Sequence, residues 1–194
     1  MSVGARIPLQ LADHIAKQAS DVLRPVVATL EVVGSVRRRR DIVGDIEFLA
    51  QPAFDLDLLG GRTVSIEPVK AAMLKLGTWV KGGDRMMQVT ALLGRPGLKL
   101  DLYLVHPPSA LGSQLAIRTG PADLSHYVVM RMQYFGYRHT DGYAIKVSTG
   151  ETVPTDSEEQ FFALAGVPCV PPDRRDELFA RIWREHPPKG ATRV

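Results

Sequence analysis

Three acidic residues of the chain have the spacing and surroundings of metal ligands. Asp45 and Glu47 stand two residues apart in the apolar segment 42–50, which is typical of a strand, so both side chains are expected on one face. Asp101 is the one acid in the alternating segment 98–105, also predicted as a strand. If the two strands are neighbours, three carboxylates converge. Close carboxylates repel one another, and divalent cations such as Mg²⁺ relieve that repulsion and promote in-line displacement at phosphorus.

A glycine–serine turn and a run of arginines precede the acidic pair. Gly34 and Ser35 follow the apolar, β-branched segment 26–33, whose second half predicts a strand. Backbone N–H groups at such a turn, with the serine hydroxyl, can hold a phosphate. The four arginines at 37–40 cannot all face one way on a helical turn, so at most two of them are expected to reach a bound nucleotide.

Each of these features also has a plainer interpretation. Acidic pairs are common on the solvated face of a half-exposed strand, and a Gly-Ser pair after a strand is a common turn. A run of arginines can be a solvated surface or a nonspecific polyanion-binding patch. The combination of all three features in one segment of the chain is what favours a site.

Composition limits the class of protein. The chain has 194 residues, 45% of them apolar and 23% charged, which suits one globular domain or two small lobes. Lysine and arginine number 24 against 21 aspartates and glutamates, a surplus that permits a polyanionic partner without requiring one. The single cysteine, Cys169, excludes an internal disulfide framework. No apolar run approaches the roughly 20 residues of a membrane helix and no signal peptide is evident, so a soluble, cytoplasmic protein is expected.

The spacing of apolar residues, and the residues that typically begin or end helices and strands, predict both helices and strands in each half of the chain. The sequence therefore predicts an α+β fold. The segments expected to be helical are 8–24, 67–76, 110–117 and 122–135, one that opens near 156–159, and one that starts at 171–173 and runs to about 185. The expected strands are the second half of 26–33, then 42–50 and 98–105, a hairpin of 78–81 with 86–93, and a second hairpin that turns at 140–142.

The motifs together resemble the signature of the nucleotidyltransferase superfamily and, more narrowly, the catalytic palm and the thumb of family X DNA polymerases, the group that includes polymerase beta. Seven further stretches match in order: Arg-Ile-Pro at 6–8, Val-Lys-Gly-Gly-Asp-Arg-Met-Met at 80–87, Lys-Leu-Asp-Leu at 99–102, Thr-Gly at 119–120, Asp-Gly-Tyr at 141–143, Pro-Thr-Asp-Ser-Glu at 154–158, and Ala-Gly-Val-Pro at 165–168 with Pro-Pro at 171–172. The resemblance implies a nucleotidyltransferase palm at 1–107, a mixed sheet with flanking helices, and a small α+β thumb at 108–194.

The resemblance also implies residue roles. Asp45, Glu47 and Asp101 would be catalytic and hold two Mg²⁺ ions, for which Mn²⁺ can substitute, and Asp101 would lie where a primer 3′-hydroxyl is activated. Nucleotide binding would fall to Arg6, Gly34, Ser35, Arg38, Gly44, Thr119 and Gly120. Contacts to DNA or to the sugar would come from Lys81, Arg85, Lys99, Ile117, Arg118, Ser125 and Tyr143, and further contacts to the DNA backbone from Arg37, Arg39, Arg131, Arg138, His139 and Lys146.

Several positions depart from the family pattern. The family usually has two aromatic residues before its Thr-Gly, where this chain has Ile117 and Arg118, so sugar selectivity is open. It often has an asparagine and an arginine on the following helix, where Ser125 and Val129 stand nearest. The lyase and helix-hairpin-helix modules have no counterpart here, so DNA is expected to be held through phosphate contacts that weaken with salt.

The resulting expectation is a monomeric, template-directed DNA polymerase that transfers a nucleotide from a dNTP to a DNA 3′-hydroxyl. Repair or gap filling is the expected setting, and by analogy with compact viral polymerases the source could be a phage or a virus. Two alternatives stay open. One is a non-templated nucleotidyltransferase that acts on RNA, a protein or a small molecule. The other is a nucleic-acid-binding protein whose active site is retired.

Overall fold

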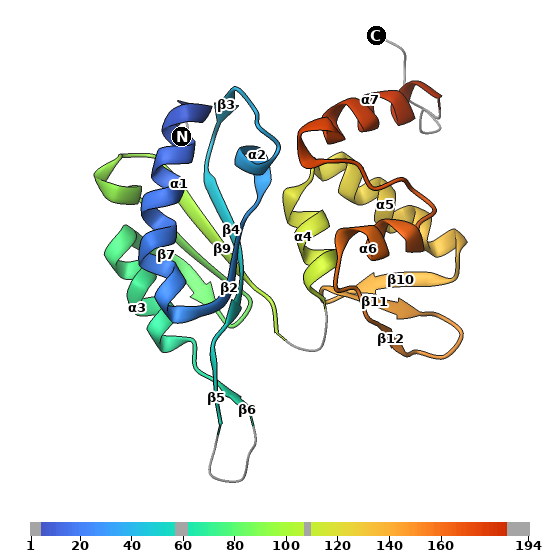
Figure 1. Cartoon of the computed structure of the whole chain (residues 1–194), viewed down its shortest axis with the longest axis horizontal. Coiled ribbons are helices and arrows are strands. Elements are labelled where there is room, and N and C mark those ends of the chain that lie inside the picture. Colours follow the sequence, from blue (N-terminus) through green and yellow to red (C-terminus); the bar gives the residue numbers. More distant parts are fainter. Residues whose placement is uncertain (1–4, 57–61, 107–109, 186–194) are drawn as a thin grey trace.

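The computed structural model describes residues 5–56, 62–106 and 110–185. Figure 1 shows two halves side by side, the first built on a sheet and the second built mainly of helices. The first half comprises β1 (Ile7–Pro8), α1 (Leu9–Leu23), η1 (Arg24–Val26), β2 (Val27–Val32), α2 (Gly34–Arg37), β3 (Ile42–Val43), β4 (Ile46–Pro52), β5 (Phe54–Leu56), β6 (Arg62–Val64), α3 (Glu67–Leu76), β7 (Thr78–Gly83), β8 (Met86–Thr90), η2 (Leu92–Gly94) and β9 (Lys99–Leu104). The predicted α+β class is confirmed.

The second half consists of four helices and a small antiparallel sheet in the described part of the chain. Its elements are α4 (Leu111–Thr119), α5 (Ala122–Tyr134), β10 (Tyr137–Thr140), β11 (Tyr143–Lys146), β12 (Thr152–Val153), α6 (Glu158–Leu164), η3 (Pro172–Arg174) and α7 (Arg175–Glu185). Helix α6 begins at a capping box, in which the side chains of Ser157 and Gln160 each bind the other residue's backbone N–H. No helix within residues 5–56, 62–106 and 110–185 is long and apolar enough to cross a membrane.

The central sheet has the strand order β2–β4–β9–β8–β7. Strands β4 and β9 are parallel, and the other neighbours are antiparallel. One face of the sheet is covered by α1 and α3 (Figure 1). The core on this side includes Ile15, Ile46, Phe48, Met73 and Leu102, all of them fully buried.

The opposite face of the sheet meets the second half of the molecule. Val33, Leu49, Val105 and Ala110 form a separate small buried cluster there, and residues of α4 pack against it. A third cluster lies within the second half, between α5, α6 and α7, and includes Leu124, Val128, Met132, Phe161, Phe162 and Leu178. Each half therefore has its own apolar core, with a thin apolar contact between them.

The elements differ from the expectations in several places. The strand predicted at 42–50 is interrupted at Gly44 and Asp45, so that Asp45 precedes β4 instead of lying within it. The second strand of the first hairpin ends at Thr90, because the backbone becomes left-handed at Ala91 and again at Leu93. Strand β1, the β5–β6 ribbon and strand β12 were not predicted, since each of these strands has only two or three residues, whereas β3 is the first part of the strand predicted at 42–50. The predicted boundary near residue 107 lies outside the described residues.

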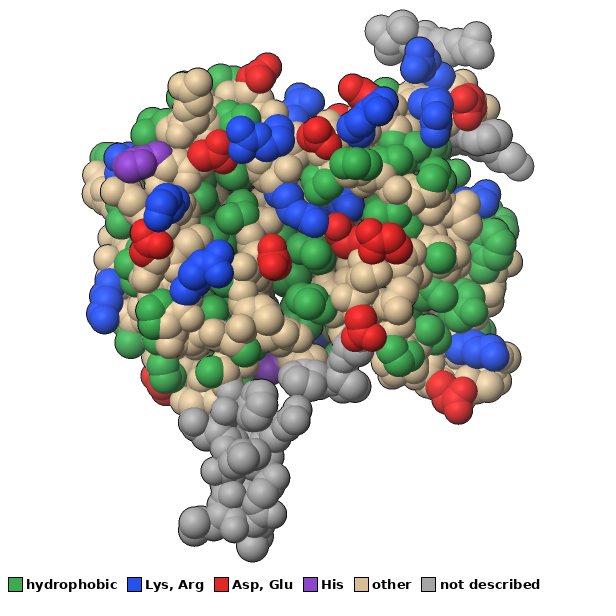
Figure 2. All heavy atoms as spheres, viewed as in Figure 1, with side chains coloured by type: hydrophobic (Ala, Val, Ile, Leu, Met, Phe, Trp, Pro, Cys, Tyr) green, Lys and Arg blue, Asp and Glu red, His purple; other side chains and the backbone are tan. Residues whose placement is uncertain are grey.

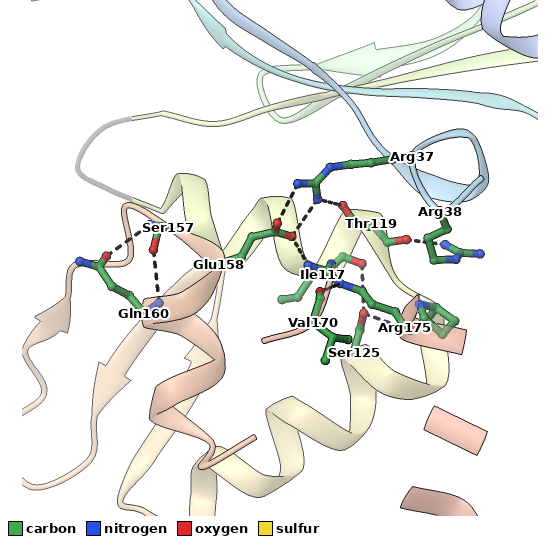
Figure 3. A network of polar contacts seen from close by, with 11 residues as sticks. Arg37, Arg38, Ile117, Thr119, Ser125, Ser157, Glu158, Gln160, Val170 and Arg175 are labelled. Carbon is green, nitrogen blue, oxygen red and sulfur yellow. Dashed lines mark hydrogen bonds and ion pairs between the residues drawn. The ribbon is translucent and has the colours of Figure 1, made fainter. Parts of the chain in front are cut away.

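A buried charged network connects the two halves (Figure 3). Arg37 of α2 donates to both carboxylate oxygens of Glu158 at 2.8 and 2.7 Å, and Arg175 of α7 donates to Glu158 Oε1 at 2.8 Å. Arg37 also donates to the Thr119 hydroxyl at 2.6 Å. Arg175 is fully buried, so Glu158 neutralises a cation that water cannot reach.

Replacing Glu158 by alanine should therefore destabilise the protein strongly. The variant leaves Arg175 buried without its counter-charge, a change that typically costs about 3–5 kcal/mol. Urea unfolding at neutral pH should show a marked drop in the midpoint. Glu159→Ala is the matched control, since that neighbouring carboxylate is exposed and contacts only the first turn of α6, so its midpoint should fall only slightly. A Glu158→Ala midpoint close to the wild-type value would contradict the assigned role.

Candidate active site

The acidic residues lie on the face of the sheet that meets the second half. Parallel pairing of β4 with β9 sets Glu47 directly beside Asp101, as the strand patterns predicted. Antiparallel pairing extends the same row, because Asp101 is opposite Gln88 on β8 and Gln88 is opposite Lys81 on β7. Four adjacent strands thus contribute one row of polar side chains, in which two carboxylates are neighbours.

Gln88 is tied directly to one of the carboxylates. Its amide Nε2 donates to Asp101 Oδ1 at 2.6 Å. Sequence reasoning missed this residue, although a signal was present. In β8 Met87 and Val89 are buried, so alternation alone would have placed Gln88 on the opposite face, with the acids.

Asp45 approaches the pair from the bend before β4. Burial raises its pKa, and the negative charge of Asp101 raises it further, while Lys99 and Arg38 act in the opposite direction. These influences place all four charged groups in one neighbourhood. Gly44, just before Asp45, has open space where a Cβ would be, and its φ is not positive, so the fold itself does not require glycine there. The missing side chain keeps the approach to Asp45 open.

Glu47 lies against the Gly34–Ser35 turn. Gly34 has a φ of +64°, and a Cβ added there would overlap Glu47 Oε2, so only glycine fits between the turn and the carboxylate. The Val33 N–H donates to the Glu47 carbonyl at 2.9 Å, which anchors the start of α2 to β4. Burial raises the pKa of Glu47 to about 7, and Asp45 and Asp101 contribute to the shift.

The electrostatics of the three acids fit a hard divalent cation. They are partly buried, they repel one another, and carboxylate oxygens are the ligands that Mg²⁺ prefers. The groups are not preassembled, however. Among residues 5–56, 62–106 and 110–185, no three His, Cys, Asp or Glu side chains gather closely enough to hold an ion. The fit therefore rests on donor chemistry and mutual repulsion, and not on a finished coordination shell.

The residues predicted to bind phosphates occupy the rim above Glu47. The Ser35 hydroxyl is buried and has no hydrogen-bond partner in the described part of the chain. Arg38 lies near enough to lower the pKa of both Asp45 and Glu47. Arg6 is exposed just before β1, where Ile7 pairs with Val43, so it stands at the end of the ribbon that leads into Gly44.

Thr119 and Gly120 belong to the junction between the halves. Thr119 is fully buried, its hydroxyl accepts from Arg37, and its carbonyl accepts from Arg38. Gly120 has a φ of +71°, and a Cβ there would crowd the Arg38 guanidinium. Thr119 and Gly120 thus lie beside Arg38, the arginine predicted to bind phosphate, and Arg38 and Thr119 are joined by a hydrogen bond.

Arg118 takes an unexpected position. Its guanidinium carbon lies 3.9 Å from the centre of the Tyr103 ring, on the strand that carries Asp101. Its positive charge lowers the pKa of Glu47, whereas burial and the nearby Glu47 and Asp101 raise the pKa of Tyr103 to about 12. Arg118 therefore works as a cation on the edge of the acidic row, a role that an aromatic residue could not fill.

A cleft of about 620 Å³ opens beside this edge. Ile117, Arg118 and Tyr143 line it, and the Tyr143 hydroxyl donates to the His106 carbonyl at 3.1 Å, which ties the two halves together. Arg85 and Asp141 also line the cleft and pair with each other at 3.0 Å. His139 also lines the cleft, and burial lowers its pKa.

Other predicted contact residues are turned elsewhere. The Ser125 hydroxyl donates to the backbone carbonyls of Ile117 and Pro121, so it does not face a base. Arg39 pairs with Asp13 at 2.8 Å, and Arg131 donates to the Ala165 carbonyl. Exposed basic side chains remain at Lys81, Lys99, Arg138 and Lys146. On the face drawn in Figure 2, basic and acidic side chains interleave where α2 faces the second half, without a field of one sign.

Comparison with models of known protein families finds no match for this chain, and a search of the curated proteins finds none either. The fold and the site geometry are therefore the basis for any functional assignment.

The raised pKa of Glu47 makes the unfolding free energy of the ligand-free protein depend on pH. Between pH 4.5 and about 7 the folded state holds a proton that the unfolded state releases, so this contribution to stability is complete below pH 4.5 and is lost as pH rises through about 7. Glu47→Gln should remove that loss. Relative to the wild type, the variant should gain on the order of 2 kcal/mol in unfolding free energy between pH 5 and pH 8. Urea titrations in EDTA at both pH values measure it, and a constant difference would contradict the shift.

Proposed function

We propose that the protein is a nucleotidyltransferase of the family X DNA polymerase type, which transfers a nucleotide from a dNTP to a DNA 3′-hydroxyl under the direction of a template, as a monomer in the cytoplasm. The observation that carries the proposal is the pairing of Glu47 with Asp101 on adjacent strands, with Asp45 just before β4 and the Gly34–Ser35 turn against Glu47. Carboxylates that repel one another next to a phosphate-sized turn and an arginine form the arrangement that phosphoryl chemistry needs.

The residues of the chain would divide the work as follows. Asp45, Glu47 and Asp101 would hold divalent ions, which supply charge neutralisation at the α-phosphate and a more acidic hydroxyl. The turn at Gly34 and Ser35 would bind the polyphosphate together with Arg38, whose planar fork suits phosphate oxygens. The carboxylate of Asp101 would accept the proton of the 3′-hydroxyl as the new O–P bond forms and the bond to pyrophosphate breaks.

A second candidate is a transferase without template selection. Ser125 supports it, because its hydroxyl is used within the backbone of the α4–α5 turn and does not point to a base. Selection of the incoming nucleotide would then depend on less specific contacts in the cleft beside Ile117 and Arg118.

Primer extension on gapped and open DNA, with each dNTP and rNTP and four templating bases, separates the candidates. Incorporation of the complementary nucleotide alone supports a polymerase, whereas transfer that ignores the template supports the second candidate. Absence of transfer with both Mg²⁺ and Mn²⁺ would refute both and favour a binding protein.

Asp101→Ala should reduce transfer by about 10³-fold or more, since the site would lose a metal ligand and the proton acceptor. The rate of single-nucleotide incorporation at saturating dNTP is the measurement. Asp84→Ala, which removes an exposed acid at the tip of the β7–β8 hairpin, should retain the wild-type rate. Circular dichroism should show both variants folded, and an active Asp101→Ala protein would end this mechanism.

Gln88 should act through Asp101. Its hydrogen bond to Oδ1 fixes the carboxylate, and the loss of such a supporting contact typically weakens metal binding by about 10-fold or more. Gln88→Leu should therefore bind Mn²⁺ about 10-fold more weakly than the wild type in an electron paramagnetic resonance titration. Gln51→Leu removes a glutamine of the same sheet that bonds Thr29, away from the acids, and should bind as the wild type does. Equal affinities in all three proteins would contradict the role of Gln88.

A further inference from the structure

The arginine assigned to the polyphosphate is already engaged by a carboxylate of the last helix. Arg38 Nε lies 3.3 Å from Asp176 Oδ2, and Arg40 Nη1 lies 3.7 Å from the same oxygen. Arg38 Nη1 meanwhile donates to the Thr119 carbonyl. Asp176, near the start of α7, therefore binds two arginines of the segment between α2 and β3.

This contact is better shielded from water than an ordinary surface pair. The side chains of Arg38 and Asp176 are 15% and 32% exposed, whereas the nearby pair of Arg174 and Glu177 is 68% and 69% exposed. The arginines at 38–40 and the acids Asp173, Asp176 and Glu177 line one groove of about 410 Å³. Water screens a half-buried ion pair less than an exposed one, so the attraction between Arg38 and Asp176 is stronger than that between Arg174 and Glu177.

Arg38 stands between two sets of anions. On one side it lowers the pKa of Asp45 and Glu47, and on the other it binds Asp176. A guanidinium has five N–H donors in a fixed fork, and here Nε and Nη1 are directed to Asp176 and Thr119. A phosphate group above the Gly34–Ser35 turn that binds through Nε displaces Asp176, and one that binds through the other donors still competes with Asp176 for the positive charge of Arg38.

We infer that Asp176 competes with a bound polyphosphate for Arg38 and thereby sets the affinity of the site for nucleoside triphosphates. The inference rests on the proposed function only in assigning a polyphosphate to this turn. The apparent affinity is proportional to the fraction of molecules in which Arg38 is free, so it decreases when Asp176 holds Arg38. Because the coupling is reciprocal, triphosphate binding also loosens α7 from the rim of the sheet.

Asp176→Asn tests the competition, since it removes the charge and keeps the size of the side chain. Calorimetric titration of the full chain with thymidine triphosphate in Ca²⁺ should show about 5-fold tighter binding than in the wild type. Glu177→Gln is the matched control. It removes one acid from the same helical turn, but that acid pairs with Arg174, so the affinity should stay at the wild-type value.

The outcomes separate this inference from the proposed function. Equal affinity of the wild type and Asp176→Asn, or an equal gain in Glu177→Gln, overturns the competition and leaves a triphosphate site standing. Failure of all three proteins to bind overturns both. Hydrogen exchange of the wild type needs no variant. Faster exchange of the α7 amides with bound triphosphate supports the inference, and unchanged or slower exchange contradicts it.

Discussion

The site depends on the parallel pairing of β4 with β9. This register sets Glu47 beside Asp101, and it also directs Phe48 and Leu102 into the core on the opposite face. Because side chains alternate along a strand, a slip of either strand by one residue would turn its acid into the core and expose its large apolar side chains. The hydrophobic core under α1 and α3 therefore enforces the geometry of the carboxylates.

That geometry opposes the stability of the ligand-free fold. Burial and mutual repulsion raise the pKa of Asp45 and Glu47, so the folded protein holds these carboxyl groups in an unfavourable environment. A purely structural sheet face would not collect acids in this way, since unpaired buried charge is costly. Such local conflict within an otherwise consistent fold is characteristic of functional sites. Arg38 offsets part of the repulsion, but Asp176 shares that cation.

The features that could be predicted from the sequence are those that depend on residues close together in the chain. Alternation predicted the strands and the shared face of Glu47 and Asp101, and the pairing of these strands followed the expectation. The break at Gly44 and Asp45 was not predicted, because apolar residues precede it and resume directly after it. Long-range partners have no local signal at all, and the hydrogen bonds between Arg37 and Glu158 join residues 121 positions apart.

The junction between the halves is held unequally along its length. At α2, Arg37 and Glu158 are 23% and 9% exposed, so their attraction is strong and resists screening by salt. At the hairpin, Arg85 and Asp141 are 67% and 65% exposed, and a pair of that kind contributes little. Between these two pairs lie a small apolar cluster around Leu49 and Val105 and the contacts of Arg118 with Tyr103 and of Tyr143 with His106. The second half is thus fixed firmly beside the Gly34–Ser35 turn and weakly where Arg85 meets Asp141.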